Sequence, residues 1–364
     1  MITKSVAEIN EYVGSSVNPM ATPDQIYELY SVPSFESGSP EIVLGADIGS
    51  TKVIVEDGDI LICKINPRIN RVWVVHHNTE YPLLASSEWI VVRNATMNSD
   101  YLKWYFSSPR FRTLLSSQVT GIGGSLTRAQ PKQVAKYPVP IPSRDEQDCI
   151  ADILARVDYL MHKYQQQIIS IEQLVKSRFI ELFGDYDLTH PQESWVTIKE
   201  IGTVVGGATP KTDHDEYWGG SYRWITPAEL DGDSGYIYDS ARKLTKAGVE
   251  SCSLQEMPVG TVILSSRAPI GKVAIAGNTF YCNQGFKNII CREGITPRYL
   301  YTVLLLNVEY LNSLGRGATF KEISKGIVES IRIPVPSMEL QQQFAAFVEQ
   351  TDKSKLCGRM EVAA

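Results

Sequence analysis

The sequence predicts two similar globular domains of mixed α/β (α+β) type, joined by long antiparallel coiled-coil helices and related by a pseudo-twofold axis. A short strand with prolines, a serine and a helix start occur twice, as VPIPSRDEQDCIADIL at 139–154 and IPVPSMELQQQFAAFV at 333–348. The segment 144–183 carries the strongest helical pattern of the chain. With 364 residues, of which 43% are hydrophobic, the chain is long and apolar enough for two domain cores.

A hairpin is predicted once in each globular block. GDILICKINPRINRVWVV at 58–75 aligns with GTVILSSRAPIGKVAIA at 260–276. Each stretch has a glycine turn, an apolar strand, a loop with proline and basic residues, and a second apolar strand. An amphipathic helix follows in each block, and in it Tyr101 corresponds to Tyr299.

Each block closes with a glycine turn, a short helix and an edge strand ended by proline, at 121–143 and 315–337. The offset between equivalent positions changes only from 202 to 198 to 194 residues along the chain. Because the order of the elements is kept, we interpret the two blocks as copies of one domain plan.

The segment 144–183 predicts one long helix that begins after Ser143, the expected N-cap. Asp145 and Glu146 in its first turn complement the helix dipole. About forty residues at 1.5 Å each give a rod of roughly 60 Å, which Gly184 ends. Apolar residues recur along it in two heptad registers: Ile150, Val157, Tyr164 and Ile171, and Leu154, Met161, Ile168, Val175 and Leu182.

A seam of this kind needs a partner helix, and the second copy of the helix start supplies one. Its apolar side chains follow the same spacing: Leu340, Phe344, Phe347 and Thr351. We expect an antiparallel pair, with the second helix stopping near Leu356; the alternative is that 144–183 covers a sheet as a single amphipathic helix. The expected segments are two domains at 1–143 and 188–337, a long spacer helix at 144–187, and a second, short spacer helix with a tail at 338–364.

Charge and cysteine content limit the classes of function. The net charge is −6, and 144–187 alone holds 9 acidic and 5 basic residues, so each near-neutral block can still present a basic face. The six cysteines form no C-x-x-C pair and are expected to be reduced and buried: Cys63, Cys149, Cys252, Cys282, Cys291 and Cys357.

The five histidines lack metal-binding spacing, so we expect no metal and no cofactor. Without a leader or a long apolar run, the protein is expected to be cytoplasmic and free of membrane contact.

One loop resembles a nucleotide-binding motif. GADIGSTK at 45–52 resembles the first phosphate loop of actin-like sugar kinases, in which Asp47 would hold a nucleotide. No further phosphate motif accompanies it, so we interpret it as a loop ahead of a strand at 53–56. The sequence also has no G-x-x-x-x-G-K-[ST] loop and no N-P-P-Y or D-P-P-Y methyltransferase motif. The chain is therefore expected to be a non-catalytic protein.

The combined motifs resemble the specificity subunit of type I restriction-modification enzymes. The resemblance covers nearly the whole chain and rests on the repeated strand-to-helix phrase, on WVTIKEIGTVVGGATPKT opening the second block, and on EYWGGSYRWITPAEL and NQGFKNIIC. The first block lacks the GGATP…YWGG opening and begins instead with YELYSVPSFESG. Its early strands are therefore expected to follow another variant of the domain.

This resemblance implies two target-recognition domains, each reading one half of a split DNA site, with the paired helices setting the number of unread base pairs. It implies double-stranded DNA as a partner, together with modification subunits that bind S-adenosylmethionine and methylate adenine. It also implies motor-nuclease (restriction) subunits that use ATP and magnesium. The alternative is an orphan or truncated specificity subunit with a regulatory role, which the short last helix favours. A third hypothesis is an actin-like kinase.

Basic and polar side chains in the aligned loops are the predicted DNA contacts. A cation in a loop between apolar strands can reach a phosphate or the O6 and N7 acceptors of guanine. The alternative for each is a solvated turn residue. The two hairpin loops supply Lys64, Arg68, Asn70, Arg71, Arg267 and Lys272. Other loops supply Thr209, Lys211, Arg223 and Lys287, and the segments after the glycine turns supply Arg128 and Lys321.

Overall fold

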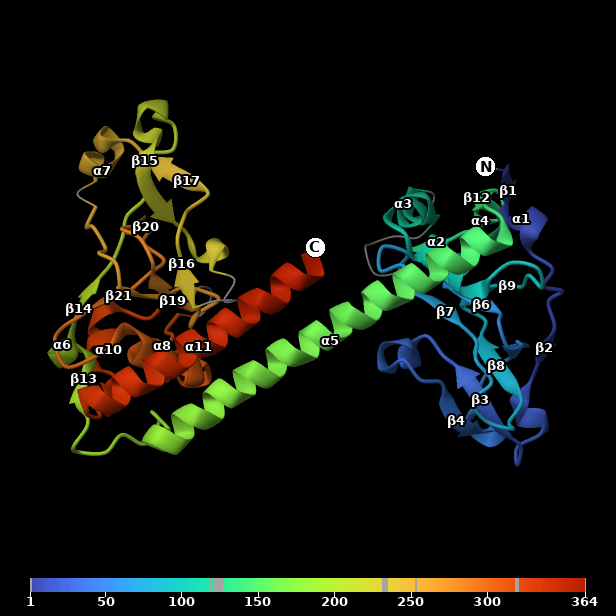
Figure 1. Cartoon of the computed structure of the whole chain (residues 1–364), viewed down its shortest axis with the longest axis horizontal. Coiled ribbons are helices and arrows are strands. Elements are labelled where there is room, and N and C mark those ends of the chain that lie inside the picture. The colour runs from blue at the N-terminus through green and yellow to red at the C-terminus, as the bar shows by residue number, and fades with distance from the viewer. Residues whose placement is uncertain are drawn as a thin grey trace. The chain divides into compact units, whose positions relative to one another are not determined.

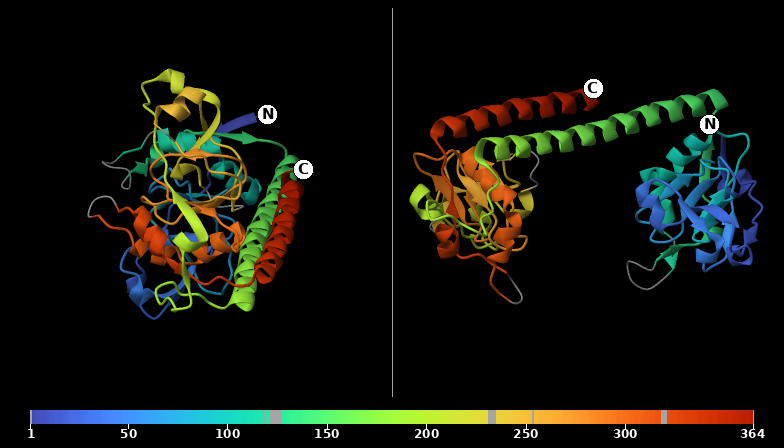
Figure 2. Two further views of the ribbon diagram at one scale, coloured as in Figure 1. Left: turned by 90° about the vertical axis from the view of Figure 1, so that its left-hand side faces the viewer. Right: turned by 90° about the horizontal axis from the view of Figure 1, so that it is seen from below.

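The computed structural model of the protein describes residues 2–117, 119–120, 127–230, 235–252, 254–317 and 321–363. The chain divides into two compact units, Met1–His162 and Lys163–Ala364. Figures 1 and 2 show the elements of each unit. The first glycine turn of the expected repeat, at 121–124, lies outside the described residues.

The first unit contains two main sheets. The larger has five strands in the order β2 (Ser16–Val17), β5 (Lys52–Ile54), β8 (Leu83–Ser86), β3 (Ile26–Tyr30) and β4 (Glu41–Leu44). The smaller has the order β7 (Val72–Val74), β6 (Ile60–Cys63) and β9 (Trp89–Val92). Two further strand pairs are β1 (Ile2–Ser5) with β12 (Pro138–Ile141), and β10 (Val119–Thr120) with β11 (Arg128–Ala129). The helices are α1 (Val6–Ile9), α2 (Ser99–Ser107), α3 (Pro109–Ser117), α4 (Pro131–Val134), η1 (Pro19–Ala21), η2 (Pro33–Ser37) and η3 (Gly45–Asp47).

Strand β6 is buried on both faces because its side chains alternate between two cores. Ile60 and Ile62 belong to the cluster that includes the buried side of α2 and α3. Leu61 and Cys63 belong to a second cluster on the other face. A short continuous apolar run is the pattern expected of such a strand. The loop that follows it, 64–71, therefore starts from a firmly packed support.

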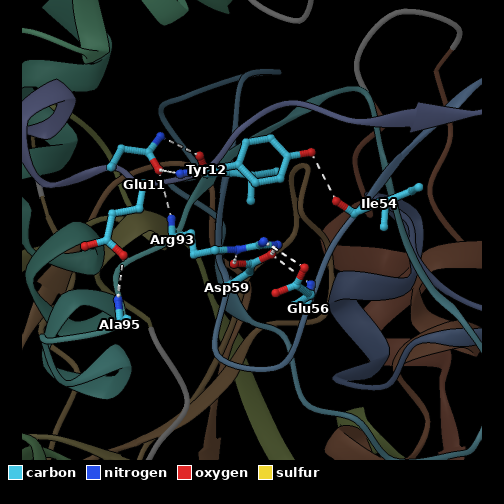
Figure 3. A network of polar contacts seen from close by, with 9 residues as sticks. Glu11, Tyr12, Ile54, Glu56, Asp59, Arg93 and Ala95 are labelled. Atoms are coloured by element: carbon cyan, nitrogen blue, oxygen red, sulfur yellow. Dashed lines mark hydrogen bonds and ion pairs between the residues drawn. The ribbon is translucent and has the colours of Figure 1, made fainter.

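A partly buried ion pair links two strands of this sheet at their ends (Figure 3). Arg93 donates through Nε and Nη2 to the two carboxylate oxygens of Asp59, at 2.7 Å each, and Asp59 is 1% exposed. Glu56 accepts a further bond from Arg93 at 2.8 Å, and the guanidinium lies 5.3 Å from the ring centre of Tyr12. The pair joins the start of β6 to the end of β9. Its planar, two-bond geometry favours one orientation of the guanidinium.

The second unit also has a five-stranded and a three-stranded sheet. Its five-stranded sheet has the order β14 (Gly202–Val205), β21 (Asn288–Cys291), β18 (Val262–Leu264), β19 (Val273–Ala276) and β16 (Tyr236–Ile237). A three-stranded sheet has the order β17 (Arg242–Leu244), β15 (Trp218–Ile225) and β20 (Tyr281–Cys282). Strand β13 (Val196–Thr197) pairs with β22 (Arg332–Ile333). The helices are α6 (Ile198–Ile201), α7 (Lys246–Ser251), α8 (Pro297–Leu306), α9 (Val308–Ser313), α10 (Lys325–Ser330), η4 (Asp215–Tyr217) and η5 (Pro227–Glu229).

The duplicated plan is confirmed in the described parts of both units. Strands β18, β19 and β21 pair as β6, β7 and β9 do. In each unit the first strand pairs with the strand that carries the proline phrase. The hydroxyls of Tyr101 and Tyr299 donate to the carbonyls of Pro140 and Pro334, both at 2.9 Å. The units differ in their remaining strands, as the different opening of the first block indicates.

The long helix α5 spans Arg144–Phe183, which are the predicted bounds. From Lys163 onward it belongs to the second unit, where α11 (Met338–Ala363) runs alongside it in the opposite direction (Figures 1 and 2). Phe344 of α11 lies between Phe179 and Phe183 of α5, with ring centroids 5.3 and 5.6 Å away. Phe179 also stacks on Tyr299 of α8 at 5.7 Å. The end of α5 thus packs against both its partner helix and the domain.

The predicted heptad seam is covered in part. Val175 and Leu182 pack against the core of the second unit, together with Phe179 and Phe183, which the two registers did not include. The rings of Phe179 and Phe183 fill the space between α11 and α8. The contact of α5 with these two helices therefore depends on packing against the domain. Three seam residues nearer the start of α5 are exposed: Leu154 37%, Val157 46% and Met161 49%.

The expectation that the second helix stops near Leu356 was wrong, because α11 continues to Ala363. The segment after Leu356 contains one glycine and no proline. A single helical glycine costs only about 1 kcal/mol relative to alanine, which does not have to end a helix. With 26 residues, α11 is still shorter than α5, which has 40.

The expectation that the cysteines are buried holds for Cys63 and Cys282 but was wrong for Cys149, which is exposed near the start of α5. Cys252 and Cys291 are partly buried, and the five cysteines whose side chains the structure describes are free thiols; the side chain of Cys357 lies outside the described parts. The expected loop at 45–52 forms η3 and the turn into β5. Within the described ranges, no group of three or more His, Cys, Asp or Glu side chains is arranged to hold a metal, and no helix has the length and apolarity to cross a membrane.

Candidate nucleic-acid interface

In the second unit, three separated chain segments meet at the loop between β18 and β19. Arg267 in this loop forms a β-bridge with Glu322. Ser266 accepts a bond from the amide of Ile323 at 2.9 Å and donates its own amide to the carbonyl of Gly285 at 2.7 Å. We call the meeting point of 265–272, 284–287 and 321–323 the second loop junction.

The second loop junction concentrates positive charge around one carboxylate. Glu322 accepts from Nε of Arg267 at 3.0 Å and from Nζ of Lys287 at 3.1 Å. Lys287 also donates to the hydroxyl of Ser266 at 3.3 Å. Burial alone would raise the pKa of Glu322, but the bonds from Lys287 and Arg267 outweigh it and lower that pKa. With two cations and one anion, the group carries a net charge of +1 at neutral pH.

Two more predicted residues lie at this junction. Lys321 is exposed and directly precedes Glu322. The hydroxyl of Thr209 donates to the amide oxygen of Gln284 at 2.7 Å, and Gln284 directly precedes the junction residue Gly285. The structure therefore brings together Thr209, Arg267, Lys287 and Lys321.

The other predicted residues of the second unit, among them Lys272 at the end of the junction loop, make bonds to residues outside the junction. Lys272 donates to the carbonyl of Pro227 at 3.1 Å. Arg223 on β15 pairs with Asp239 at 3.2 Å. The backbone carbonyl of Lys211 accepts from the indole of Trp218 at 3.2 Å. None of these bonds links its residue to Glu322.

The first unit builds a first loop junction, made of 64–71, 87–88 and 127–129. Ile65 forms a β-bridge with Arg128, and the amide of Asn66 donates to the carbonyl of Thr127 at 2.9 Å. Nη2 of Arg128 donates to the carboxylate of Glu88 at 2.9 Å. Nζ of Lys64 donates to the carbonyl of Ser87. Arg128 thus pairs with the carboxylate of Glu88, and Lys64 bonds to the backbone of the neighbouring residue Ser87.

The tip of the 64–71 loop holds the remaining candidates. Arg68 is exposed. Arg71 is mostly buried and pairs with Glu36 at 3.2 Å. Asn70 has a positive φ of 51°, and its side-chain amide donates to the carbonyl of Phe106 at 2.9 Å, so it fixes the loop to α2. Arg68 is thus the loop-tip residue that is most available to a ligand.

The two junctions occupy equivalent places but carry different side chains. Ile65 corresponds to Arg267 at an offset of 202, and Arg128 corresponds to Glu322 at an offset of 194. The same backbone bridge therefore holds an isoleucine and an arginine in one unit, and an arginine and a glutamate in the other. Sequence reasoning missed Glu322 and Glu88, because a lone glutamate carries no signal. The alignment by 194 places Glu322 opposite Arg128 and is the signal that was available.

Comparison with known proteins places these features in a family. Residues 193–357 match the family described as type I restriction modification DNA specificity domain. The chain is 42% identical over 185 residues to the type I restriction enzyme MjaIX specificity subunit of Methanocaldococcus jannaschii, covering 49% of this chain and 43% of that relative. It is 24% identical over 229 residues to the EcoR124I/EcoR124II specificity subunit of Escherichia coli, covering 60% and 55%. The match thus spans about half the length of these relatives.

Solved structures share the fold. The S subunit of a type I restriction-modification system from M. genitalium matches with a TM-score of 0.58 at 12% identity, over 100% of this chain and 92% of that one. A chain from a study of complex assembly in the type I R-M system matches with a TM-score of 0.52 at 18% identity, with the same coverage. The family match of residues 193–357 and the fold together indicate a DNA specificity protein. Residues 193–357 thus match the type I restriction modification DNA specificity domain, and the whole chain has the fold of the solved type I specificity subunits.

Proposed function

We propose that the chain recognises a bipartite DNA sequence and directs adenine methylation and cleavage of that DNA by partner subunits. The observation that carries the proposal is the loop junction, a cluster of cations built twice on one duplicated scaffold. Residues 1–143 and 188–337 act as the two target-recognition domains. The segments 144–187 and 338–364 act as spacer helices between them.

The cations of the junctions bind the DNA. Arg267, Lys287 and Lys321 in the second unit, and Lys64, Arg68 and Arg128 in the first, contact phosphates or base edges. Arginine in the major groove forms two bonds with guanine O6 and N7, and a carboxylate accepts from cytosine N4. Since equivalent positions hold different side chains, the two domains recognise different half-sites. The other predicted contacts are Asn70, Arg71 and Lys272, which lie within the junction segments, and Thr209, Lys211 and Arg223, which lie outside them.

The chain itself catalyses no reaction in this proposal. Helix α5 is rich in acidic residues and carries an apolar heptad pattern, so it suits contact with protein partners better than contact with phosphate. Those partners are modification subunits, which methylate adenine, and restriction subunits, which move and cut DNA. A DNA-recognition subunit works where the chromosome lies, so the proposal places the protein in the cytoplasm.

The test is co-expression of the chain with a modification subunit of its own system, followed by mapping of methylated adenines on genomic DNA. We expect methylation at one sequence made of two short specific parts, separated by a fixed number of unspecified base pairs. A variant with Arg267→Ala should change the specificity of one part only. Methylation that requires a single uninterrupted sequence, or no methylation, would contradict the proposal.

A further inference from the structure

One buried glutamine lies at the start of α5. Gln147 is 3% exposed. Its amide oxygen accepts from the backbone amide of Asn98 at 2.9 Å, and its amide nitrogen donates to the carbonyl of Pro142 at 3.0 Å. Asn98 is the N-cap of α2. A single side chain thus joins the first turn of α5, the turn before α5 and the start of α2.

The same arrangement recurs at the start of α11. Gln341 is fully buried, its amide oxygen accepts from the backbone amide of Thr296 at 2.8 Å, and its amide nitrogen donates to the carbonyl of Pro336 at 2.9 Å. Thr296 is the N-cap of α8, the counterpart of α2. A third bond, at 3.0 Å, runs to the carbonyl of Gly294. The two glutamines are 194 residues apart, which is the offset of the repeat at this point.

The two side chains have a specific geometric effect. A buried amide that loses its partners is costly, so each glutamine holds its helix in the orientation that keeps both the N-cap amide and the proline carbonyl bonded. The hydroxyl bonds from Tyr101 on α2 to Pro140, and from Tyr299 on α8 to Pro334, hold the chain just before each spacer helix beside α2 and α8. Each domain therefore fixes the direction in which its own spacer helix begins.

We propose that Gln147 and Gln341 are positioning residues that set how many unread base pairs the protein accepts between the two half-sites. This inference rests on the proposed function. Changing the spacing by one base pair shifts a half-site by about 3.4 Å and turns it by about 34–36° around the DNA axis. A recognition domain that follows such a turn has to reorient about its helix start, and the glutamine bonds resist that movement.

The experiment uses the chain in complex with its modification subunit and DNA sites whose spacer is of natural length, one base pair shorter or one longer. The variants are Gln147→Met, Gln341→Met and the double variant, since methionine keeps the length of the side chain and lacks its hydrogen bonds. The matched controls are Gln342→Met, the exposed neighbour on α11, and Gln165→Met on an exposed position of α5.

The measured quantity is the ratio of methylation rates on natural and altered spacers. We expect this ratio to fall by about tenfold in the double variant, which corresponds to about 1.4 kcal/mol. It should fall by a smaller factor in each single variant and stay unchanged in the controls. Rates that fall equally on all three spacers, with the ratio unchanged, would show a merely structural role and overturn the inference.

Two safeguards keep the result decisive. The single variants are scored in the same way, so the outcome does not depend on folding of the double variant. A wild-type complex that methylates no bipartite site would instead overturn the proposed function. Spacer selectivity in the wild type that persists in all variants would overturn only the role of the glutamines.

Discussion

Replacement of Glu322 by glutamine tests whether the second loop junction faces DNA. Glu322 accepts from both Arg267 and Lys287, at 3.0 and 3.1 Å. The change keeps the shape of the side chain and removes its negative charge, so the net charge of the three groups rises from +1 to +2. Burial would raise the pKa of Glu322, but the bonds from its two cationic partners outweigh burial and lower the pKa. The carboxylate is therefore ionised at neutral pH, and the substitution removes a full negative charge.

The magnitude follows from counterion release. Each phosphate neutralised by the protein adds about 0.9 to the slope of log K against log salt concentration. One additional unpaired cation at the junction should therefore make the slope steeper by about 0.9. Raising the salt concentration from about 50 to 200 mM should then weaken DNA binding by the variant roughly threefold to fourfold more than it weakens binding by the wild type. The gain in affinity should be largest at low salt and should occur on DNA of any sequence.

The assay is fluorescence anisotropy of a labelled duplex titrated with the full chain at several salt concentrations. Glu349→Gln is the matched control, because Glu349 also pairs with a lysine, Lys353 at 2.9 Å, but lies on α11. We expect a steeper slope for Glu322→Gln and the wild-type slope for the control. An unchanged slope, or an equal change in both variants, would refute the placement of the junction against DNA.

Two substitutions and one labelling experiment test the fold. Arg93→Met removes the cationic partner of the buried Asp59 carboxylate, which keeps the bond from the Glu56 amide, and should destabilise the first unit by about 3–5 kcal/mol. Slow amide hydrogen exchange that persists in β6 and β9 would contradict this. Phe344→Ala empties a fully buried site and should cost about 3–5 kcal/mol, seen as faster exchange at the end of α5; equal acceleration in the first unit would contradict it. Burial raises the pKa of Cys282 to about 12, so at pH 8 a thiol reagent should label exposed Cys149 first and Cys282 only after unfolding; labelling at equal rates would contradict this.

The parts of the fold that were predictable are those that local pattern determines. The bounds of α5 follow from the cap at Ser143, the acidic first turn and Gly184, and the structure has the same bounds. The repeated hairpins were predictable because β6 and β18 are short, fully apolar runs between turns. In both cases the residues that decide the structure are neighbours in the chain.

The parts that were not predictable depend on contacts between distant residues. Phe179 and Phe183 break the heptad registers, because they pack against Phe344 and the domain as well as along a helix seam. The role of Glu322 could not be predicted, because it depends on the β-bridge to Arg267, which places Glu322 beside Lys287. The helix-start glutamines were visible in the sequence, but their bonds to the starts of α2 and α8 required coordinates.

The most direct test of a molecule with two independent recognition domains is an exchange of one domain. Residues 1–143 are replaced by the equivalent block of a relative with a different recognition sequence, and the hybrid is co-expressed with the modification subunit. Methylated adenines are then mapped on genomic DNA. The account predicts that one half-site changes while the other half-site stays the same. Methylation at the original sequence, or a change in both half-sites, would contradict it.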